Sequence, residues 1–193
     1  TQFLSRVNMN FDLNVTEYVS VDFAALQTVI DALGGLDIDL TRQEIGHLNA
    51  YNQVMSEEQG IPYEPVIDSN DTDPTFDGYE TRTFHLNGIQ SVAYARIRYT
   101  SGYDMRRSAR QRLVISKIFA KLKQADLGTV DSVLNLVLPK VTTNLENTKI
   151  FSLVKPLLSY NMPEEGMKGF PFAYLMDEGG AATGEDCIVP VTL

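Results

Sequence analysis

The alternation of strand-like and helix-like patterns in the first forty residues constrains the fold of this chain most strongly. Residues 17–23 place apolar side chains at every second position, as a strand does, and residues 23–33 follow with helical spacing. Gly34 and Gly35 end that helix, and residues 36–40 alternate again. A strand, a helix and a second strand in this order predict a crossover unit of an α/β protein.

Capping residues predict where two of the helices begin. Asp22 is placed to cap the helix that starts at Phe23, while Thr41 and Glu44 form a capping box that opens a polar helix reaching about Met55. We expect that polar helix on the outside of the molecule. Further helices are predicted at residues 2–11, 88–94, 104–124, 130–138 and 150–158, and edge strands at residues 167–175 and 188–193.

Length and composition favour a single globular domain over residues 1–193. The chain is 44% hydrophobic and 21% charged, so it can bury a core without disulfides or a metal. Its single cysteine, Cys187, excludes the disulfide-rich class, and no apolar run is long enough for a membrane span. Because the sequence begins at Thr1 in the middle of a helical pattern, we expect it to be part of a longer product.

A long acidic surface loop is predicted within this domain at residues 57–83, which are rich in proline, glycine and aspartate. Asp71, Asp73 and Asp77 are weakly similar to a calcium loop, but the glutamate that closes such a loop at its twelfth position is out of register. We therefore expect no calcium site there.

Charge is distributed very unevenly along the chain. The net charge of −9 argues against a nucleic-acid partner held by phosphate contacts. Residues 96–112, hereafter the cationic segment, nevertheless hold six arginines and a single acid, Asp104. Like charges packed this closely repel one another, so a partner should neutralise them.

The spacing within the cationic segment predicts an anion site. Arg96 and Arg98 follow a short helix, while Asp104, Arg107 and Gln111 share one face of the next helix. Guanidinium groups bind phosphate oxygens in a bidentate manner, and a helix start offers free amides as well, so we infer a phosphate or pyrophosphate ligand. Surface salt bridges between these arginines and the acidic loop are the alternative interpretation.

Several motifs resemble those of the LytR-CpsA-Psr family. They are the run from His85 to Tyr99 (HLNGIQSVAYARIRY), the pattern Asp104-x-x-Arg107-x-x-Arg110-Gln111, and the segments 18–23 and 29–38. The resemblance implies a three-layer α/β/α fold with a central mixed sheet, incomplete here at its N-terminus. It also implies a cell-wall phosphotransferase on the outer face of a bacterial membrane, to which a missing N-terminal segment would anchor it.

The family resemblance also implies roles for residues. In such enzymes a glycopolymer, such as teichoic acid or capsular polysaccharide, passes from a polyprenyl-pyrophosphate carrier to peptidoglycan. Asp104 and Arg107 would be catalytic, with Asp104 orienting the arginines or acting as a base. Magnesium is the implied cofactor, and we expect its ligands upstream of Thr1 and no metal site within this chain. The pyrophosphate would be bound by Arg96, Arg98, Arg107, Gln111 and, as a less certain neighbour, Arg110.

The predicted helix at residues 130–138 is apolar nearly all round. By the same resemblance, Val133, Leu136 and Val137 would line a tunnel for the lipid tail of the carrier. An ordinary core helix explains the pattern equally well.

Two further functions stay open at this point. A non-catalytic module that binds pyrophosphate lipids or other polyanions would keep the arginines without turnover. A transcription regulator is less compatible with the net acidity, and the sequence contains no helix-turn-helix signature. His47 and His85 lack metal-ligand partners in the sequence, and we expect His85 to be a packing or hydrogen-bonding residue.

Overall fold

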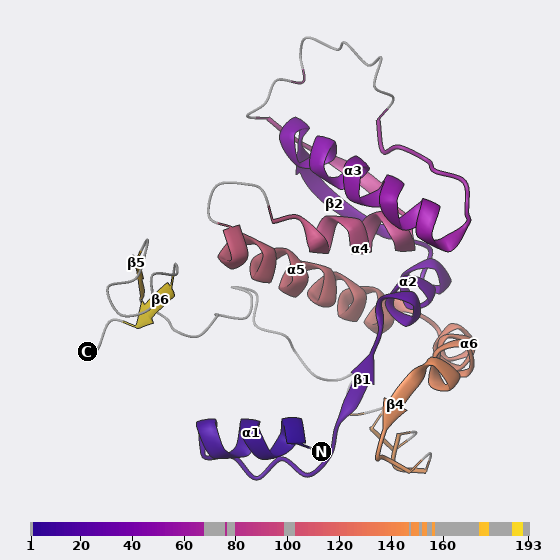
Figure 1. The fold of residues 1–193 in the computed structure, drawn as a ribbon. Helices are drawn as coiled ribbons and strands as arrows, with labels where there is room; N and C mark the ends of the chain where they lie inside the picture. Colours follow the sequence, from indigo (N-terminus) through magenta and orange to yellow (C-terminus); the bar gives the residue numbers. More distant parts are fainter. Residues whose placement is uncertain are drawn as a thin grey trace. The chain divides into compact units, whose positions relative to one another are not determined.

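The computed structural model divides the chain into two compact units, Thr1–Asn161 and Met162–Leu193 (Figure 1). Each unit is described by itself, and the single domain expected from the sequence remains a prediction. The structure describes residues 2–67, 76, 80–98, 103–146, 148–150, 152–153, 156, 174–177 and 187–190.

The first unit is a mixed α/β structure in which helices predominate. In chain order its elements are α1 (Gln2–Phe11), β1 (Val19–Val21), α2 (Phe23–Ala32), β2 (Leu36–Thr41), α3 (Arg42–Gln59), β3 (Thr81–Leu86), α4 (Gly88–Arg96), α5 (Tyr103–Gln124), α6 (Leu127–Val137), a 3-10 turn η1 (Leu138–Lys140) and β4 (Val141–Thr143). The helix expected near residues 150–158 is described only in part, with helical residues at 148–150, 152–153 and 156.

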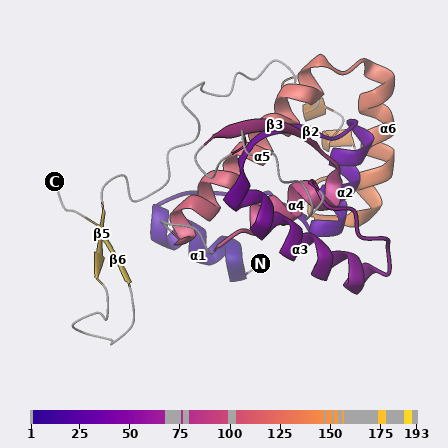
Figure 2. The same ribbon diagram turned by 90° about the horizontal axis from the view of Figure 1, so that it is seen from above.

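The described strands of this unit form two antiparallel pairs, and Figure 2 shows β2 and β3 side by side. β2 pairs with β3 along its whole length, from Leu36 opposite Leu86 to Thr41 opposite Thr81, and β1 pairs with β4. The prediction that β1 and β2 form one crossover unit was wrong, because β2 bonds to β3 and the two strands lie in different sheets.

β3 was missed by the sequence analysis, which placed residues up to 83 in the acidic loop. Alternate side chains of this strand, at Arg82, Phe84 and Leu86, are more buried than their neighbours, and Leu86 is fully buried. Phe76, also expected in the loop, is only 2% exposed and lies within 6 Å of Phe84 by ring centroids (5.9 Å). An aromatic side chain therefore draws part of the predicted surface loop into the core.

The predicted helix starts are confirmed by their hydrogen bonds. The Asp22 carboxylate accepts the Ala25 N–H at 2.7 Å at the start of α2. At the start of α3, Thr41 and Glu44 form the reciprocal capping box. α3 then runs further than expected, to Gln59, and ends where Gly60 takes a left-handed conformation (φ 65°) that glycine adopts without strain.

α4 is the central helix of the first unit. Its residues from Ser91 to Ala95 are buried, and it packs against α2, α3 and α5 (Figure 1). α4 begins directly against α2, because the Gly88 N–H donates to the Asp31 carboxylate at 2.6 Å and a side chain at Gly88 would collide with the α2 backbone. The polar helix α3 does not lie wholly outside, since it buries Leu48 and Met55 in the same core.

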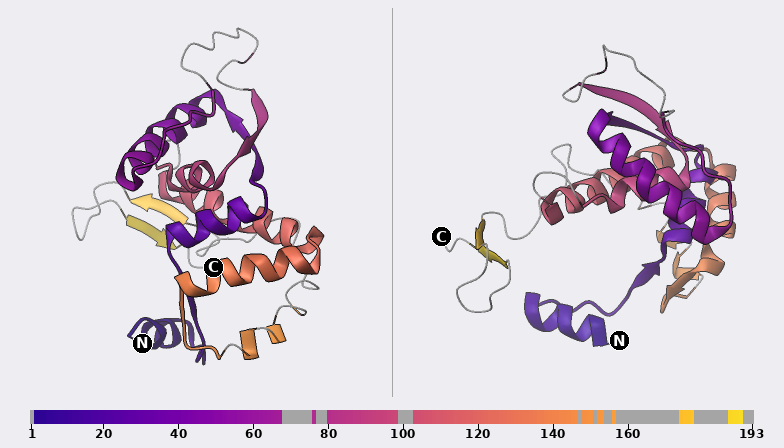
Figure 3. Two further views of the ribbon diagram at one scale, coloured as in Figure 1. Left: turned by 90° about the vertical axis from the view of Figure 1, so that its right-hand side faces the viewer. Right: turned by 45° about the horizontal axis from the view of Figure 1, so that its top comes forward.

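The helix α6, orange in Figure 3, packs against α2. The Asp126 carboxylate caps α6 by accepting the backbone N–H groups of Gly128 and Thr129. No described helix is both long and apolar enough to cross a membrane.

In the second unit, the described residues form one antiparallel pair of strands, β5 (Tyr174–Asp177) and β6 (Cys187–Pro190). The sequence analysis expected strands at residues 167–175 and 188–193, and both expected ranges overlap the observed strands in part. The Gly179-Gly180 turn that was predicted between them lies outside the described residues.

Candidate functional site

The cationic segment spans the end of α4 and the beginning of α5. Arg96 is the last residue of α4, Arg98 follows it after Ile97, and Arg107 lies near the start of α5. α5 begins at Tyr103, so Asp104 belongs to the first helical turn. The Asp104 side chain lies outside the part of the structure that is described.

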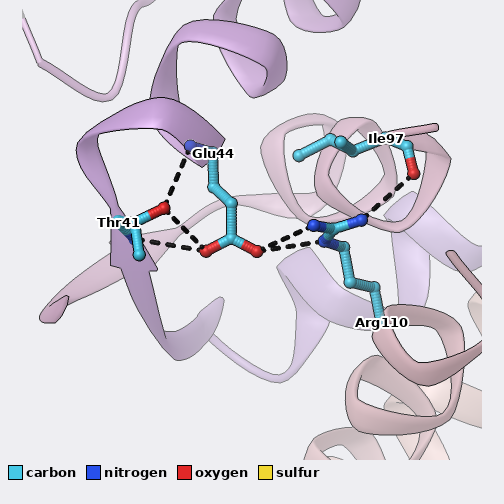
Figure 4. A network of polar contacts seen from close by, with 4 residues as sticks. All are labelled: Thr41, Glu44, Ile97 and Arg110. Carbon is cyan, nitrogen blue, oxygen red and sulfur yellow. Dashed lines mark hydrogen bonds and ion pairs between the residues drawn. The ribbon is translucent and has the colours of Figure 1, made fainter. Parts of the chain in front are cut away.

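Arg110 is the deepest arginine among the described residues of this segment, at 4% exposure. Its Nε and one terminal nitrogen donate to the same oxygen of Glu44, at 3.1 and 3.0 Å (Figure 4). The other Glu44 oxygen accepts the Thr41 N–H and hydroxyl, both at 3.2 Å. One carboxylate thus caps α3 and neutralises the buried guanidinium.

Burial also changes the acid–base chemistry beside this ion pair. The Arg110 guanidinium carbon lies over the Tyr94 ring, 5.8 Å from its centroid. Burial, reinforced by the negative charge of Glu44 and opposed by Arg110, raises the pKa of Tyr94 to about 12. The phenol therefore stays neutral at physiological pH, and the negative charge beside Arg110 is that of Glu44.

Arg110 also joins the two halves of the cationic segment. Its second terminal nitrogen donates to the Ile97 carbonyl at 3.3 Å (Figure 4), and Ile97 lies between Arg96 and Arg98. Arg107 precedes Arg110 by three residues, which places it about one helical turn away on the same side of α5. This hydrogen bond therefore brings the turn that carries Arg107 next to the chain between Arg96 and Arg98.

The other arginines predicted for the anion site are more exposed than Arg110. Arg98 is exposed, and Arg96 and Arg107 are half-buried. Arg96 lies over two aromatic rings, with its guanidinium carbon 5.4 Å from the centroid of Phe23 and 5.7 Å from that of Tyr51. Gln111 is exposed on α5.

An apolar pocket of about 410 Å³ lies between α6, α2 and the β1–β4 pair. Two of the three predicted lining residues, Val133 and Val137, do line it. The third, Leu136, does not line the pocket and is 51% exposed. Apart from Thr143, the lining is apolar: Val19, Val21, Val29, Leu122, Val130, Val133, Leu134, Val137, Leu138, Val141, Leu145, Ile150 and Leu153.

Comparison with known proteins now identifies the family. The sequence profile of the LytR_cpsA_psr family matches residues 2–170. The chain belongs to the LytR-CpsA-Psr family. This confirms the resemblance seen in the motifs, and the cationic segment lies wholly within the matched range.

Two curated relatives and one solved structure illustrate the membership. Biofilm regulatory protein A of Streptococcus mutans is 27% identical over 175 residues, covering 90% of this chain and 37% of that protein. The teichoic acid transferase TagV of Bacillus subtilis, named for transfer from a polyisoprenyl carrier to peptidoglycan, is 25% identical over 142 residues, covering 72% of this chain and 31% of that protein. The chain thus spans about a third of the length of these curated relatives.

The fold of the LytR-CpsA-Psr family is confirmed by structural similarity. The crystal structure of B. subtilis TagV superposes with a TM-score of 0.55 at 19% identity, covering 96% of this chain and 61% of that one. The α/β class expected from the sequence is therefore correct for this family member.

The residues that support the LytR-CpsA-Psr arginines were missed by the sequence analysis. Glu44 was recognised as a capping residue but not as the partner of Arg110. A signal was present, because Arg110 precedes the buried residues Val114 and Ile118 by one and two turns of α5 and so lies on its apolar stripe. No sequence pattern linked Phe23 and Tyr51 to Arg96, because they lie on α2 and α3 and Arg96 lies on α4.

Among the side chains that the structure describes, no three His, Cys, Asp or Glu residues gather closely enough to hold a metal ion. Magnesium is therefore an expectation from the family alone.

Proposed function

We propose that this chain takes part in transferring a glycopolymer from a polyprenyl-pyrophosphate carrier to peptidoglycan at the bacterial cell envelope. Family membership supports this proposal, as does the name of the relative TagV, a teichoic acid transferase. Because the chain spans only part of these relatives, the complete activity, the acceptor and an N-terminal membrane anchor are all parts of the proposal.

The anion site of the proposal consists of Arg96, Arg98 and Arg107, with Gln111 as a neutral donor. The observation that carries it is the Arg110 hydrogen bond to the Ile97 carbonyl, which brings the start of α5 to the end of α4. Phosphoryl transfer depends on positioning and charge neutralisation more than on covalent help from the protein. Arginines held at adjoining helix ends are suited to both tasks.

We assign Arg110 and Asp104 different roles from those arginines. Arg110 is occupied by Glu44 and Ile97, so it positions the site and does not contact the ligand in this proposal. Asp104, in the first turn of α5, would orient Arg107 or accept a proton from the attacking hydroxyl. Arg107 would stabilise the negative charge that develops during transfer.

The apolar pocket would hold part of the polyprenyl tail. Its lining from Val133, Val137 and neighbouring side chains offers almost no hydrogen-bonding partner, which suits a hydrocarbon chain and not a sugar. Magnesium is kept as a family-based expectation, with ligands outside this chain.

The proposal is tested by calorimetric titration of the chain with inorganic pyrophosphate and with geranyl pyrophosphate. We expect saturable binding of both, and tighter binding of geranyl pyrophosphate because its prenyl chain buries apolar surface at about 0.8 kcal/mol per CH₂. Absence of binding for both ligands would contradict the proposal.

A non-catalytic pyrophosphate-lipid binding module is the second candidate, because the arginines around the Arg110–Ile97 hydrogen bond and the apolar pocket would serve such a module equally well. The two candidates differ in turnover. Incubating the chain with a lipid-linked glycopolymer, peptidoglycan and magnesium should give a covalent product only if the chain is a transferase. Binding without any product supports the non-catalytic module.

A further inference from the structure

The position of Arg96 depends on two aromatic side chains from different helices. Its guanidinium carbon lies over the Phe23 ring and over the Tyr51 ring, at 5.4 and 5.7 Å from their centroids. Phe23 is the first residue of α2, and Tyr51 lies in the middle of α3. The end of α4 is thus held between the helices that flank it.

Phe23 is unusually placed for a phenylalanine, because it is 55% exposed on the surface of a folded unit. Its backbone is fixed by the cap at Asp22, whose carboxylate accepts the Ala25 N–H. An exposed aromatic ring at a capped helix start buries little surface, so its contribution to the core is small. We therefore attribute the role of Phe23 to its contact with the Arg96 guanidinium.

Tyr51 shares a face of α3 with Glu44, since the two residues are seven positions apart, or about two turns. Glu44 holds Arg110, and Tyr51 lies against Arg96. One face of α3 therefore contacts two arginines of the cationic segment: Glu44 forms an ion pair with Arg110, and the Tyr51 ring lies against Arg96.

The two kinds of support differ in what they leave available to a ligand, although both guanidinium groups stay positively charged. A carboxylate neutralises the guanidinium and occupies its N–H groups. An aromatic ring attracts the cation through its π face, supplies no counter-charge and does not take up the guanidinium N–H groups as a carboxylate does. An arginine held against two rings loses less side-chain freedom when it binds an anion, which favours a bidentate contact.

We propose that Phe23 and Tyr51 are positioning residues that hold the Arg96 guanidinium in the orientation that binds a pyrophosphate. This inference rests on the proposed function, because it assumes that Arg96 contacts the anion. It adds two residues from outside the cationic segment to the site.

The test compares Phe23→Leu and Tyr51→Leu, which remove a ring, with Phe23→Tyr and Tyr51→Phe, which keep it. Affinity for inorganic pyrophosphate is measured by calorimetry. We expect each leucine variant to bind about three-fold more weakly, the double leucine variant about ten-fold, and the ring-keeping variants within about two-fold of the parent chain. Far-UV circular dichroism checks that the variants are folded.

A double-mutant cycle shows whether the rings act through Arg96. In an Arg96→Ala background, Phe23→Leu and Tyr51→Leu should cause no further loss of pyrophosphate affinity. An additional three-fold loss in that background would overturn the inference, since the rings would then contribute to binding independently of Arg96.

A measurement without ligand separates the inference from the proposed function. In NMR spectra of the free chain, ring currents should shift the side-chain protons of Arg96, and the double leucine variant should abolish that shift. Loss of affinity in Arg96→Ala with full affinity in the double leucine variant would overturn the positioning role and leave the proposed function intact. Full affinity in Arg96→Ala would overturn the proposed function, and the positioning inference with it.

Discussion

Arg96 and Arg110 belong to the same cationic segment but lie in opposite environments. Arg110 is almost fully buried and paired with Glu44, whereas Arg96 is half-buried and lies over the rings of Phe23 and Tyr51. The difference shows that a run of like charges does not have one role. A buried carboxylate occupies one guanidinium, while the other lies over aromatic rings that supply no counter-charge, and our proposal therefore assigns the two arginines different roles.

The largest effect is expected from removing the charge of Glu44. Glu44→Gln leaves the Arg110 guanidinium buried without a counter-charge and weakens the cap of α3. Breaking a buried ion pair costs about 3–5 kcal/mol, and we expect the free energy of unfolding to fall by about 3 kcal/mol. Urea denaturation measures this change.

Glu58→Gln is the matched control, because Glu58 lies exposed on the same helix. Its effect should stay within about 0.5 kcal/mol. Equal free energies of unfolding for the two variants would mean that the Glu44–Arg110 pair contributes nothing to stability. Arg110 would then have no structural role to contrast with Arg96.

The second effect concerns the other arginine. Arg96→Ala should weaken the binding of inorganic pyrophosphate by about 1–3 kcal/mol, the range for hydrogen bonds to charged groups, while the free energy of unfolding changes little. Calorimetry measures the first quantity and urea denaturation the second. Arg6→Ala, on the exposed helix α1, controls for the loss of one positive charge. A lower free energy of unfolding with unchanged pyrophosphate affinity in Arg96→Ala would reverse the comparison.

A third variant extends the comparison to the apolar pocket. Val137→Phe should fill part of the pocket and weaken the binding of geranyl pyrophosphate by about 1 kcal/mol, with the affinity for inorganic pyrophosphate unchanged. Leu136→Phe is the matched control, because Leu136 precedes Val137 but does not line the pocket. Equal losses for both ligands would indicate a general distortion and not a tail-binding site.

The smallest effect is expected at an exposed acid–base pair. His85 Nδ1 lies 2.7 Å from the Asp37 carboxylate across β2 and β3, and this hydrogen bond lowers the pKa of Asp37 below its usual 3.8. A lowered pKa stabilises the fold above the usual value, and that contribution is lost as the pH falls through the lowered one. His85→Ala should therefore raise the pKa of Asp37 toward 3.8.

NMR titration of the Asp37 carboxyl carbon measures that pKa, and His47→Ala is the control because His47 lies on α3. The exposure of both partners should make the contribution to stability small, in contrast to the buried pair at Glu44. A large fall in the free energy of unfolding of His85→Ala would contradict the expectation that this exposed pair contributes less than the buried Glu44–Arg110 pair.

Local signals were sufficient to predict much of the fold. The caps at Asp22 and Thr41 gave the starts of α2 and α3, and His85 is a hydrogen-bonding residue as expected. Strand pairing was not predictable in the same way, because β1 bonds to β4 more than a hundred residues later. Composition also misplaced Phe76, whose burial depends on contacts with distant elements.

The candidate site was predictable only in part for the same reason. The spacing of arginines located the cationic segment, and the family motifs named its members. The spacing did not show that Glu44 pairs with Arg110 or that Phe23 and Tyr51 support Arg96, since these contacts join residues on different helices. Contacts between helices, and not the charge run itself, therefore separate the roles of the arginines.

The most direct test of the central claim is an NMR titration of the chain with inorganic pyrophosphate, observing the Nε–Hε signals of individual arginines. We predict that the signals of Arg96, Arg98 and Arg107 shift with the same dissociation constant for pyrophosphate. The signal of Arg110 should stay nearly constant. Unconnected shifts with different saturation points, or a shift confined to Arg110, would contradict the claim that these three arginines form one anion site.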